Sequence, residues 1–510
     1  MKKLKVKFCD IREGRYEVFI NEEDAKDLGL NPNDRVKISV DRKSIIAVVN
    51  TTKTLTPKGY IGLSREVCSF FKLKGEREVV LTLTEKPKSI EFIKKKLDGH
   101  ELTEQEYDTI VKDVVSRSLT EIEITAFVIG VYINGMSIEE ASYLTKKMAE
   151  NGEMLELEKK PIFDKHSLGG VPGNKITLLI VPIVAAAGLT IPKTSSRAIT
   201  SACGTADIME VLAPVTFSAR EMEEIVNKTN GMIAWGGGAN LAPADDIFIN
   251  VEYPLAIDPH YMALCSVMAK KYAVGANFVV IDLPMGKETK VPTIEKARKY
   301  ARDFIALGEK LGMHVECVIT YGEKPIGRAI GPALEAREAL QALEGKEVAS
   351  SFVEKATGIA GILLEAGGVA KHGEGAKLAL EYIRNGKALK KMKEIIEAQG
   401  GDPKISSSDV PIGEYREKVY AERGGYITEF SNKSLVKIAR AAGAPKDKGA
   451  GILLHVSKGE RVKEGDILFE IFSESEYKLE RAIRLANELK PVTIEGMLLQ
   501  RIPEYRIFGY

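Results

Sequence analysis

The period of the hydrophobic pattern changes along this chain of 510 residues, and each change predicts a different kind of structure. Residues 1–85 carry short runs of β-branched and apolar residues at 16–20, 35–40 and 79–83, separated by turn residues such as those at 31–34. Such runs are typical of strands. We predict a small β-barrel-like module over this region.

Helical spacing begins near residue 86. Ile90, Ile93 and Leu97 would share one helix face, and Ser137 precedes Glu140 by three positions, which is the capping-box pattern of a helix N-terminus. We therefore predict a helical lobe over 86–160, completed by about 245–275.

Residues 161–405 alternate glycine-containing loops, helices and strands. Predicted strands at 279–283 and 314–320 flank a predicted helix at 292–311, and this alternation favours βαβ units with a mainly parallel sheet. The apolar stretch 176–191 is shorter than the ~20 residues that span a bilayer, so it predicts a buried core helix.

Short β runs return at 449–455 and 466–471. They predict a C-terminal α+β domain over 406–510. The fold class is therefore α/β, with a helical lobe, a mixed or parallel-sheet α/β lobe, and small β-rich domains at both ends.

Composition and charge narrow the function classes. The chain has 73 Lys plus Arg against 72 Asp plus Glu, so no net field attracts nucleic acid or a membrane surface, and we expect neither as a partner. Five cysteines form no CxxC pair, and the N-terminus lacks the apolar stretch of a signal peptide. We expect a cytoplasmic protein. Abundant Lys and Glu with only four Gln are typical of a thermophilic source.

Three polar clusters carry candidate chemistry. The first, at 164–175, combines Lys165, Ser167 and paired glycines ahead of the apolar helix. Glycine backbone and a helix N-terminus can both bind an anion, so this stretch predicts an oxyanion cradle. The spacing differs from a Walker loop. The alternative is a strand-to-helix turn with structural glycines.

The second cluster, at 194–207, contains several Ser and Thr hydroxyls and Arg197. These groups suit phosphate oxygens and sugar hydroxyls, although a polar loop with capping residues is the alternative. In the third, at 256–271, Asp258 is the predicted N-cap of a helix that begins at Pro259. Ser266 and Lys270 would share a face of that helix, and a simple capped helix remains the alternative.

The order and spacing of five motifs resemble the thymidine and pyrimidine-nucleoside phosphorylase family over about residues 88–505. The motifs are Lys165–Gly170, Gly204–Asp207, Leu241–Asp245, Lys324–Gly327 and Gly331–Ala339. The resemblance implies a fold of the nucleoside phosphorylase II type, whose two lobes close over phosphate and nucleoside. It also implies a homodimer formed through the helical lobe.

Further features resemble the archaeal branch of that family, which cleaves nucleoside 5′-monophosphates. They are the N-terminal module, the hydroxyl loop 196–201, Trp235–Gly238, Asp258–His260 and Lys290. The resemblance implies phosphorolysis of AMP, and also of CMP and UMP, to the free base and ribose 1,5-bisphosphate. Inorganic phosphate would be the co-substrate, with no cofactor, and the N-terminal module would join dimers into a larger oligomer. The alternative is a thymidine or pyrimidine-nucleoside phosphorylase.

The resemblance and the polar clusters assign roles residue by residue. Asp258 would be the general acid that protonates the leaving base. Substrate-binding residues would be Gly170, Ser196, Arg197, Ala198, Ile199, Thr200, Ser201, Thr205, Ser266 and Lys290, and phosphate-binding residues would be Lys165, Ser167, Ser195 and Lys270. No metal site is expected, because no His and carboxylate spacing suggests one.

Two other classes compete with this interpretation. A phosphoribosyltransferase like the anthranilate enzyme needs Mg²⁺, and only Asp245-Asp246 offers paired carboxylates for it. A biotinyl or lipoyl carrier would resemble the C-terminal domain, but no Met-Lys-Met acceptor surrounds Lys458.

Overall fold

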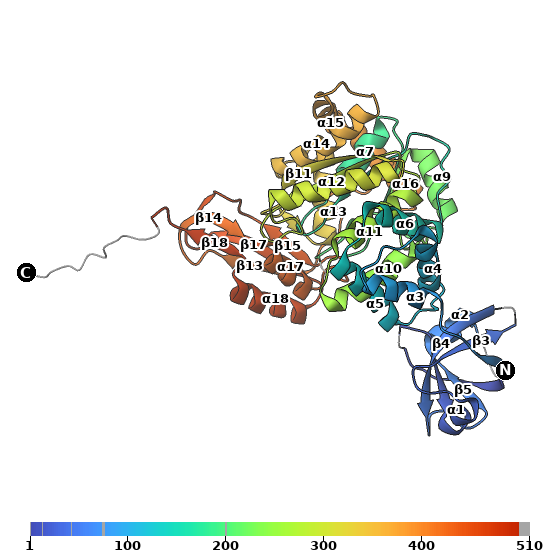
Figure 1. Cartoon of the computed structure of the whole chain (residues 1–510). Helices are drawn as coiled ribbons and strands as arrows, with labels where there is room; N and C mark the ends of the chain where they lie inside the picture. Colours follow the sequence, from blue (N-terminus) through green and yellow to red (C-terminus); the bar gives the residue numbers. More distant parts are fainter. Residues whose placement is uncertain (1, 13, 42, 74–76, 199–200, 499–510) are drawn as a thin grey trace, which may run out of the picture. The chain divides into compact units, whose positions relative to one another are not determined.

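A computed structural model describes residues 2–12, 14–41, 43–73, 77–198 and 201–498 (Figure 1). The described residues form two compact units. Unit 1 comprises residues 1–151 and 242–266, and unit 2 comprises 152–241 and 267–510.

The N-terminal part of unit 1 is a closed barrel, blue in Figure 1, with strand order β1-β5-β2-β4-β3-β6. Its core is aliphatic and includes Val18, Ile38 and Val49, all buried. The elements are β1 (Lys2–Phe8), β2 (Glu17–Asn21), α1 (Glu22–Leu28), β3 (Arg35–Val40), β4 (Lys43–Thr52), β5 (Tyr60–Leu63), α2 (Arg65–Phe71) and β6 (Glu78–Leu83).

Helices make up the rest of unit 1. Capping boxes begin several of them, and the predicted one is confirmed: Ser137 caps the backbone N–H of Glu140, whose carboxylate accepts from the N–H of Ser137. The helices are α3 (Ser89–Leu97), α4 (Glu104–Val115), α5 (Glu121–Asn134), α6 (Ile138–Glu150) and α10 (Pro243–Leu255). Helix α11 (His260–Ala273) begins in unit 1 and ends in unit 2.

The core of unit 2 is a parallel sheet. Strands β7 (Phe163–Ser167), β10 (Phe278–Met285) and β11 (His314–Tyr321) pair in the order β11-β10-β7. Strands β8 (Ile191–Ser195) and β9 (Gly231–Trp235) pair in parallel beside them, and a bridge between Ile162 and Thr190 joins the two groups. The predicted parallel sheet is confirmed.

Helices cover both faces of this sheet. The Sγ of Cys317 on β11 points to the Ala301 carbonyl of α12, whereas Val318 and Thr320 face α14 across a pocket. Alternate side chains of a strand point to opposite faces, so α12 and α14 cover opposite faces of β11. The helices are α7 (Thr177–Ala186), α8 (Thr205–Met209), α9 (Ala219–Thr229), α12 (Ile294–Lys310), α13 (Pro332–Leu343), α14 (Ser350–Ala366), α15 (Gly375–Arg384) and α16 (Lys387–Ala398).

One helix is shorter than the sequence predicted. The apolar stretch 176–191 was expected to form a single helix, but α7 ends at Ala186 and β8 begins at Ile191. Gly188 has φ +85°. Glycine adopts this left-handed conformation readily, and a residue in this conformation commonly ends a helix. Ala187 and Leu189 extend the apolar run past the end of the helix, which hid the boundary in the sequence.

The C-terminal domain packs two antiparallel sheets with two helices, shown in orange to red in Figure 1. The sheet orders are β12-β15-β17-β13 and β16-β14-β18. The elements are β12 (Ala329–Ile330), β13 (Tyr415–Tyr420), β14 (Gly425–Phe430), α17 (Asn432–Ala442), β15 (Gly451–Leu454), β16 (Arg461–Val462), β17 (Ile467–Ser473), α18 (Glu476–Leu489) and β18 (Val492–Glu495). Across the described ranges, every helix is too short or too polar to cross a membrane.

Candidate active site

The parallel strands of unit 2 place several polar loops at one edge of the sheet. Strands β7, β8, β9 and β10 end at Ser167, Ser195, Trp235 and Met285. The carboxyl ends of parallel strands meet at the same edge, where open α/β sheets bind their ligands. The first two predicted polar clusters therefore lie side by side.

Lys165 lies inside this edge. It is buried on β7, and its Nζ donates to Ser167 Oγ at 3.1 Å. Burial, reinforced by the nearby Lys355 and Lys271, lowers the pKa of Lys165 to about 7, although Asp282 opposes the shift. A bound anion would favour the charged ammonium, because opposite charges stabilise one another strongly in a buried site.

The surroundings of Lys165 contain more buried cations than anions. Asp164 pairs with Lys271 at 2.6 Å and lies 3.9 Å from Lys193, and Asp282 pairs with Lys355 at 2.9 Å. Burial and the neighbouring Lys271 hold the pKa of Lys193 well below its usual value. Two carboxylates thus face four lysines, including Lys165.

His166 does not add to this positive charge at neutral pH. Burial, together with the positive charges of Lys193 and Lys271, lowers the pKa of His166 well below its usual value. The neutral imidazole keeps one N–H that can donate a hydrogen bond.

The loop after β7 lies directly against the loop after β10. Gly170 has φ +109°, and a Cβ there would lie 3.1 Å from both the Lys290 backbone N and the Thr289 Cα. Glycine is therefore required for this close approach. The structure brings together Gly170 and Lys290, which are 120 residues apart in the chain.

The loop after β8 is held by a short helix. Asp207 of α8 accepts hydrogen bonds from the backbone N–H groups of Ala198 and Gly204, at 2.8 and 2.9 Å. A Cβ at Gly204 would lie 2.6 Å from the Ser196 carbonyl oxygen, so the two segments are in contact. Ile199 and Thr200 lie outside the described residues.

The predicted substrate-binding residue Arg197 pairs with a carboxylate of the protein in this structure, and its binding role stays a prediction. Its guanidinium makes two hydrogen bonds to Glu210, at 2.6 and 2.5 Å, and lies 5.0 Å from the centre of the Trp235 ring. Lys448 also pairs with Glu210. Protein carboxylate thus neutralises this cation and fixes the loop, while the backbone of 196–198 stays at the sheet edge.

The other predicted hydroxyl residues near this loop are Ser195, Ser201 and Thr205, and two of them hydrogen-bond to the backbone of the loop. Ser201 donates to the Cys203 carbonyl oxygen and accepts, through its own carbonyl, from Arg440 of the C-terminal domain. Thr205 begins α8 and is half-buried. Ser195 Oγ donates to the Ser196 carbonyl oxygen at 3.3 Å.

Lys270 reaches the same edge from helix α11. A Cβ at Gly236 would lie 3.8 Å from Lys270 Cδ and 3.6 Å from Thr194 Cβ. Thr194 Oγ1 is buried without a hydrogen-bond partner in the structure. Buried hydroxyls normally have partners, so Thr194 adds a donor that the sequence interpretation did not select.

Asp258 and Ser266 belong to unit 1. Helix α11 begins at His260, one residue later than predicted, and the Pro259 carbonyl oxygen accepts from the Ala263 N–H at 3.0 Å. The N-cap role expected for Asp258 stays a prediction. Ser266 lies four residues before Lys270 on the same helix.

Sequence reasoning missed the buried charges beneath the site. Lys271 could have been found, because it follows the buried Leu264, Val267 and Met268 at helical spacing and must therefore face inward. Asp164, Lys193, Asp282 and Lys355 carry no such signal, since their pairing depends on which strands and helices meet.

No group of three or more His, Cys, Asp or Glu in the described part of the chain could hold a metal ion. Lys458, the residue considered as a carrier attachment point, donates to the Tyr321 hydroxyl at 3.2 Å. That lysine therefore joins the C-terminal domain to β11.

Three family models match consecutive parts of the chain. The glycosyl transferase family helical bundle domain matches residues 90–152, its a/b domain matches 159–389, and the pyrimidine nucleoside phosphorylase C-terminal domain matches 426–492. Fold and matches define an enzyme of the pentosyltransferase class.

Similar proteins of known name define the family more narrowly. The chain is 52% identical to the AMP phosphorylase of Methanosarcina barkeri over 98% of both chains. It is 53% identical to the AMP phosphorylase of Thermococcus kodakarensis over 98% of this chain and 99% of that one. The chain belongs to the AMP phosphorylase family.

Solved structures confirm the fold class. Anthranilate phosphoribosyltransferase from Thermus thermophilus superimposes with a TM-score of 0.50 at 19% identity, covering 60% of this chain and 98% of that one. The nucleoside phosphorylase II type of architecture predicted from the sequence is therefore present.

Proposed function

We propose that this enzyme catalyses the phosphorolysis of AMP, and also of CMP and UMP. A phosphate oxygen attacks C1′ of the ribose, the bond from C1′ to the base nitrogen breaks, and a proton passes to the base. The products are the free base and ribose 1,5-bisphosphate. The full-length relatives do not favour a thymidine phosphorylase.

The excess of buried lysines at the sheet edge supports this proposal most directly. Lys165, Lys193, Lys271 and Lys355 surround the two carboxylates of Asp164 and Asp282, and Lys165 lies two residues before the end of β7, where it donates to Ser167. A buried cation that lacks a counter-ion is costly, and a bound phosphate would supply the missing negative charge. An enzyme that must bring two phosphate groups together needs such a site.

The remaining candidate residues would have two roles, which are binding of the nucleotide and transfer of a proton to the base. Gly170 and Lys290, in contact across two loops, would bind the nucleotide together with residues 196–201, Thr205 and Ser266. Asp258 would donate the proton to the base. Positioning and charge neutralisation would supply most of the rate, and general acid catalysis typically contributes 10²–10⁴-fold.

The reaction that we propose needs phosphate as a co-substrate and no cofactor or metal. Every step is a substitution at carbon with a proton transfer, so no electron acceptor is required. Lysines and backbone N–H groups provide the charge stabilisation that a metal would otherwise supply.

The direct test is release of free base from a panel of substrates, with and without phosphate. AMP, CMP and UMP should be cleaved only when phosphate is present, and phosphorus NMR should identify ribose 1,5-bisphosphate as the product. Adenosine should have a kcat/KM lower by about a hundredfold or more, because it cannot use the binding energy of the 5′-phosphate. Equal turnover of thymidine and AMP would overturn the assignment.

We further propose a homodimer formed through the helical lobe and a location in the cytoplasm. Ile122, Tyr132 and Ile133 of α5 are 78%, 54% and 70% exposed, and an apolar helix face of this kind is typical of an interface. Replacing Ile133 with Glu should yield monomers in light scattering. All five cysteines are free thiols, which fits a reducing compartment.

A further inference from the structure

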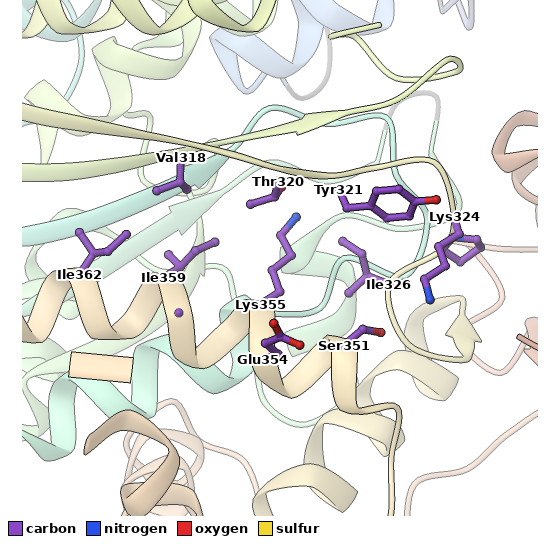
Figure 2. A pocket seen from close by; sticks show the side chains of 12 residues that line it. Val318, Thr320, Tyr321, Lys324, Ile326, Ser351, Glu354, Lys355, Ile359 and Ile362 are labelled. Atoms are coloured by element: carbon purple, nitrogen blue, oxygen red, sulfur yellow. The ribbon is translucent and has the colours of Figure 1, made fainter. Parts of the chain in front are cut away.

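A cavity lies in unit 2, between strand β11 and helix α14 (Figure 2). Its volume is about 440 Å³, within the range of small-molecule sites. Val318, Ile326, Ile359 and Ile362 line it with aliphatic surface, and polar groups lie at one end. The lining includes Lys324 of the Lys324–Gly327 motif and Lys355, one of the buried lysines near Lys165, but none of the predicted substrate- or phosphate-binding residues.

Helix α14 carries a glycine at this cavity that its own packing does not require. Gly358 lies in the middle of the helix, and a Cβ built there would meet no atom within 4 Å. Glycine in a helix interior costs about 1 kcal/mol relative to alanine. Because neither backbone conformation nor a close neighbour demands glycine here, the open space itself is the remaining reason for it.

Two lysines supply positive charge at the polar end. The side chain of Lys355 is 9% exposed, and its ammonium pairs with Asp282 at 2.9 Å. Figure 2 shows this ammonium pointing toward Thr320. Its Nζ has no hydrogen-bond acceptor with good geometry, so donor capacity remains for a ligand.

Lys324 is the second of these lysines. It is half-buried and lies at the cavity mouth near Tyr321 and Ser351 (Figure 2). The carboxylate of Glu354 also lies at the mouth but is exposed to solvent, where water screens its charge. The cavity therefore combines an apolar floor with a cationic end.

We propose that this cavity is a binding site for a small organic anion with an apolar body, separate from the sites for nucleotide and phosphate. The apolar body would contact the aliphatic floor, and the anionic group would lie between Lys324 and Lys355. Ser351 would add a hydroxyl donor, whereas the Thr320 hydroxyl already donates to Asp282 Oδ1 at 2.5 Å. The chemistry fits an aromatic or branched carboxylate or sulfonate better than a nucleotide, whose sugar would leave hydroxyls unpaired on aliphatic surface.

Asp282 connects this cavity to the candidate active site. Its carboxylate pairs with Lys355, while its backbone carbonyl oxygen accepts from the Leu168 N–H in the phosphate loop at 2.8 Å. An anion that draws Lys355 away from Asp282 would change the charge next to Lys165. Occupancy of the cavity should therefore alter the KM for phosphate.

The test uses anilinonaphthalene sulfonate, a fluorescent aromatic anion, titrated into the full-length protein. Binding should persist with saturating AMP alone and with saturating phosphate alone, because the proposed site is separate from both. Gly358→Leu fills the open space and should weaken binding by about tenfold or more. Lys324→Met should weaken it similarly, while Lys324→Arg should retain it.

Two control variants separate loss of the site from loss of the fold. Gly358→Ala keeps most of the space and should retain binding while raising the unfolding temperature. Lys377→Leu adds a leucine to an exposed position of α15 and should change nothing. The proposal fails if Gly358→Leu binds the dye as the unaltered protein does, if AMP or phosphate displaces the dye, or if Lys377→Leu loses binding equally.

Discussion

Lys165 is buried two residues before the end of β7, and its charge should control phosphate binding. Burial lowers its pKa to about 7, so the ammonium is charged below that pH and neutral above it. Because kcat/KM reports the free enzyme, we expect kcat/KM for phosphate to fall as the pH rises above about 7. Initial rates across a pH series measure this effect.

Phosphate itself ionises in a similar pH range, so a variant must separate the two effects. Lys165→Arg keeps a cation that stays charged at all working pH values, and its profile should retain only the ionisation of phosphate. Lys165→Met should lose about 2 to 4 kcal/mol of transition-state stabilisation with the fold intact. If all three proteins share one profile and similar rates, Lys165 is a structural residue.

Asp258 has two interpretations, helix cap and general acid, that predict different outcomes for one substitution. Asp258→Asn keeps a side-chain oxygen but has no acidic proton to donate. As a general acid, Asp258 would be needed for protonating the base, and kcat should fall by about 10² or more while AMP binding survives. Steady-state kinetics and a binding titration measure the two quantities.

A substrate with a better leaving group provides the control for Asp258. A nucleotide whose base departs without protonation should recover most of the lost rate in the Asp258→Asn variant. Unchanged kcat with AMP would instead support a purely structural role, in which only a small loss of stability is expected.

At this scale the sequence predicted residues in loops better than residues in the core. Lys165, Gly170 and Lys290 were selected from motifs, and the structure brings Gly170 and Lys290 into contact. Asp282 was not selected, since nothing near it in the chain reveals that Lys355, 73 residues later, will be its partner. The ion pair of Arg197 with Glu210 was likewise not predictable, because the two residues are 13 positions apart and no pattern in the sequence links them.

At the scale of elements, a buried lysine connects the loop after β7 to the segment before β12 and to helix α13. Lys175 Nζ donates to the carbonyl oxygens of Gly173 and Ile326, at 2.9 and 2.7 Å, and pairs with Glu338 at 2.8 Å. It is fully buried. This one ammonium therefore fixes the loop that precedes α7 against the segment before β12.

Lys175→Met should remove that connection and leave Glu338 buried without a counter-charge. We expect a loss of about 3 to 5 kcal/mol in unfolding free energy, measured by chemical denaturation. The double variant Lys175→Met, Glu338→Gln should recover part of the loss, because a neutral amide oxygen still accepts from the Ala329 N–H. Equal stability of the single variant and the unaltered protein would contradict this role.

Strands and helices with a clear period were predictable, and their ends were less so. The strand predicted at 35–40 coincides with β3, and the helix predicted at 292–311 is α12 (Ile294–Lys310). The failure at 176–191 has a physical cause, since Ala187 and Leu189 continue the apolar run beyond the end of α7, and Ile191 alone of the stretch belongs to β8. Only Gly188 marked the boundary between them.

At the scale of the whole molecule, the barrel has a hydrophobic core of its own. That core is made of residues between Leu4 and Leu81, while the ion pair between Arg35 and Glu123 connects the barrel to α5. Glu123 also completes the capping box of α5 with Thr120. Removing the barrel should therefore leave the helices of unit 1 correctly capped.

Deleting residues 1–84 tests whether the barrel joins dimers, as the family resemblance implies. The exposed apolar face of α5, with Ile122 and Ile133, remains in the shortened chain and should still support a dimer. If the barrel supplies the contacts between dimers, the number of chains per particle in light scattering should fall to two. Phosphorolysis of AMP should survive, since all the candidate active-site residues lie beyond residue 160. An unchanged number of chains per particle would show that the barrel has no part in assembly. The Ile133→Glu variant would then test whether the exposed face of α5 forms the contacts between chains.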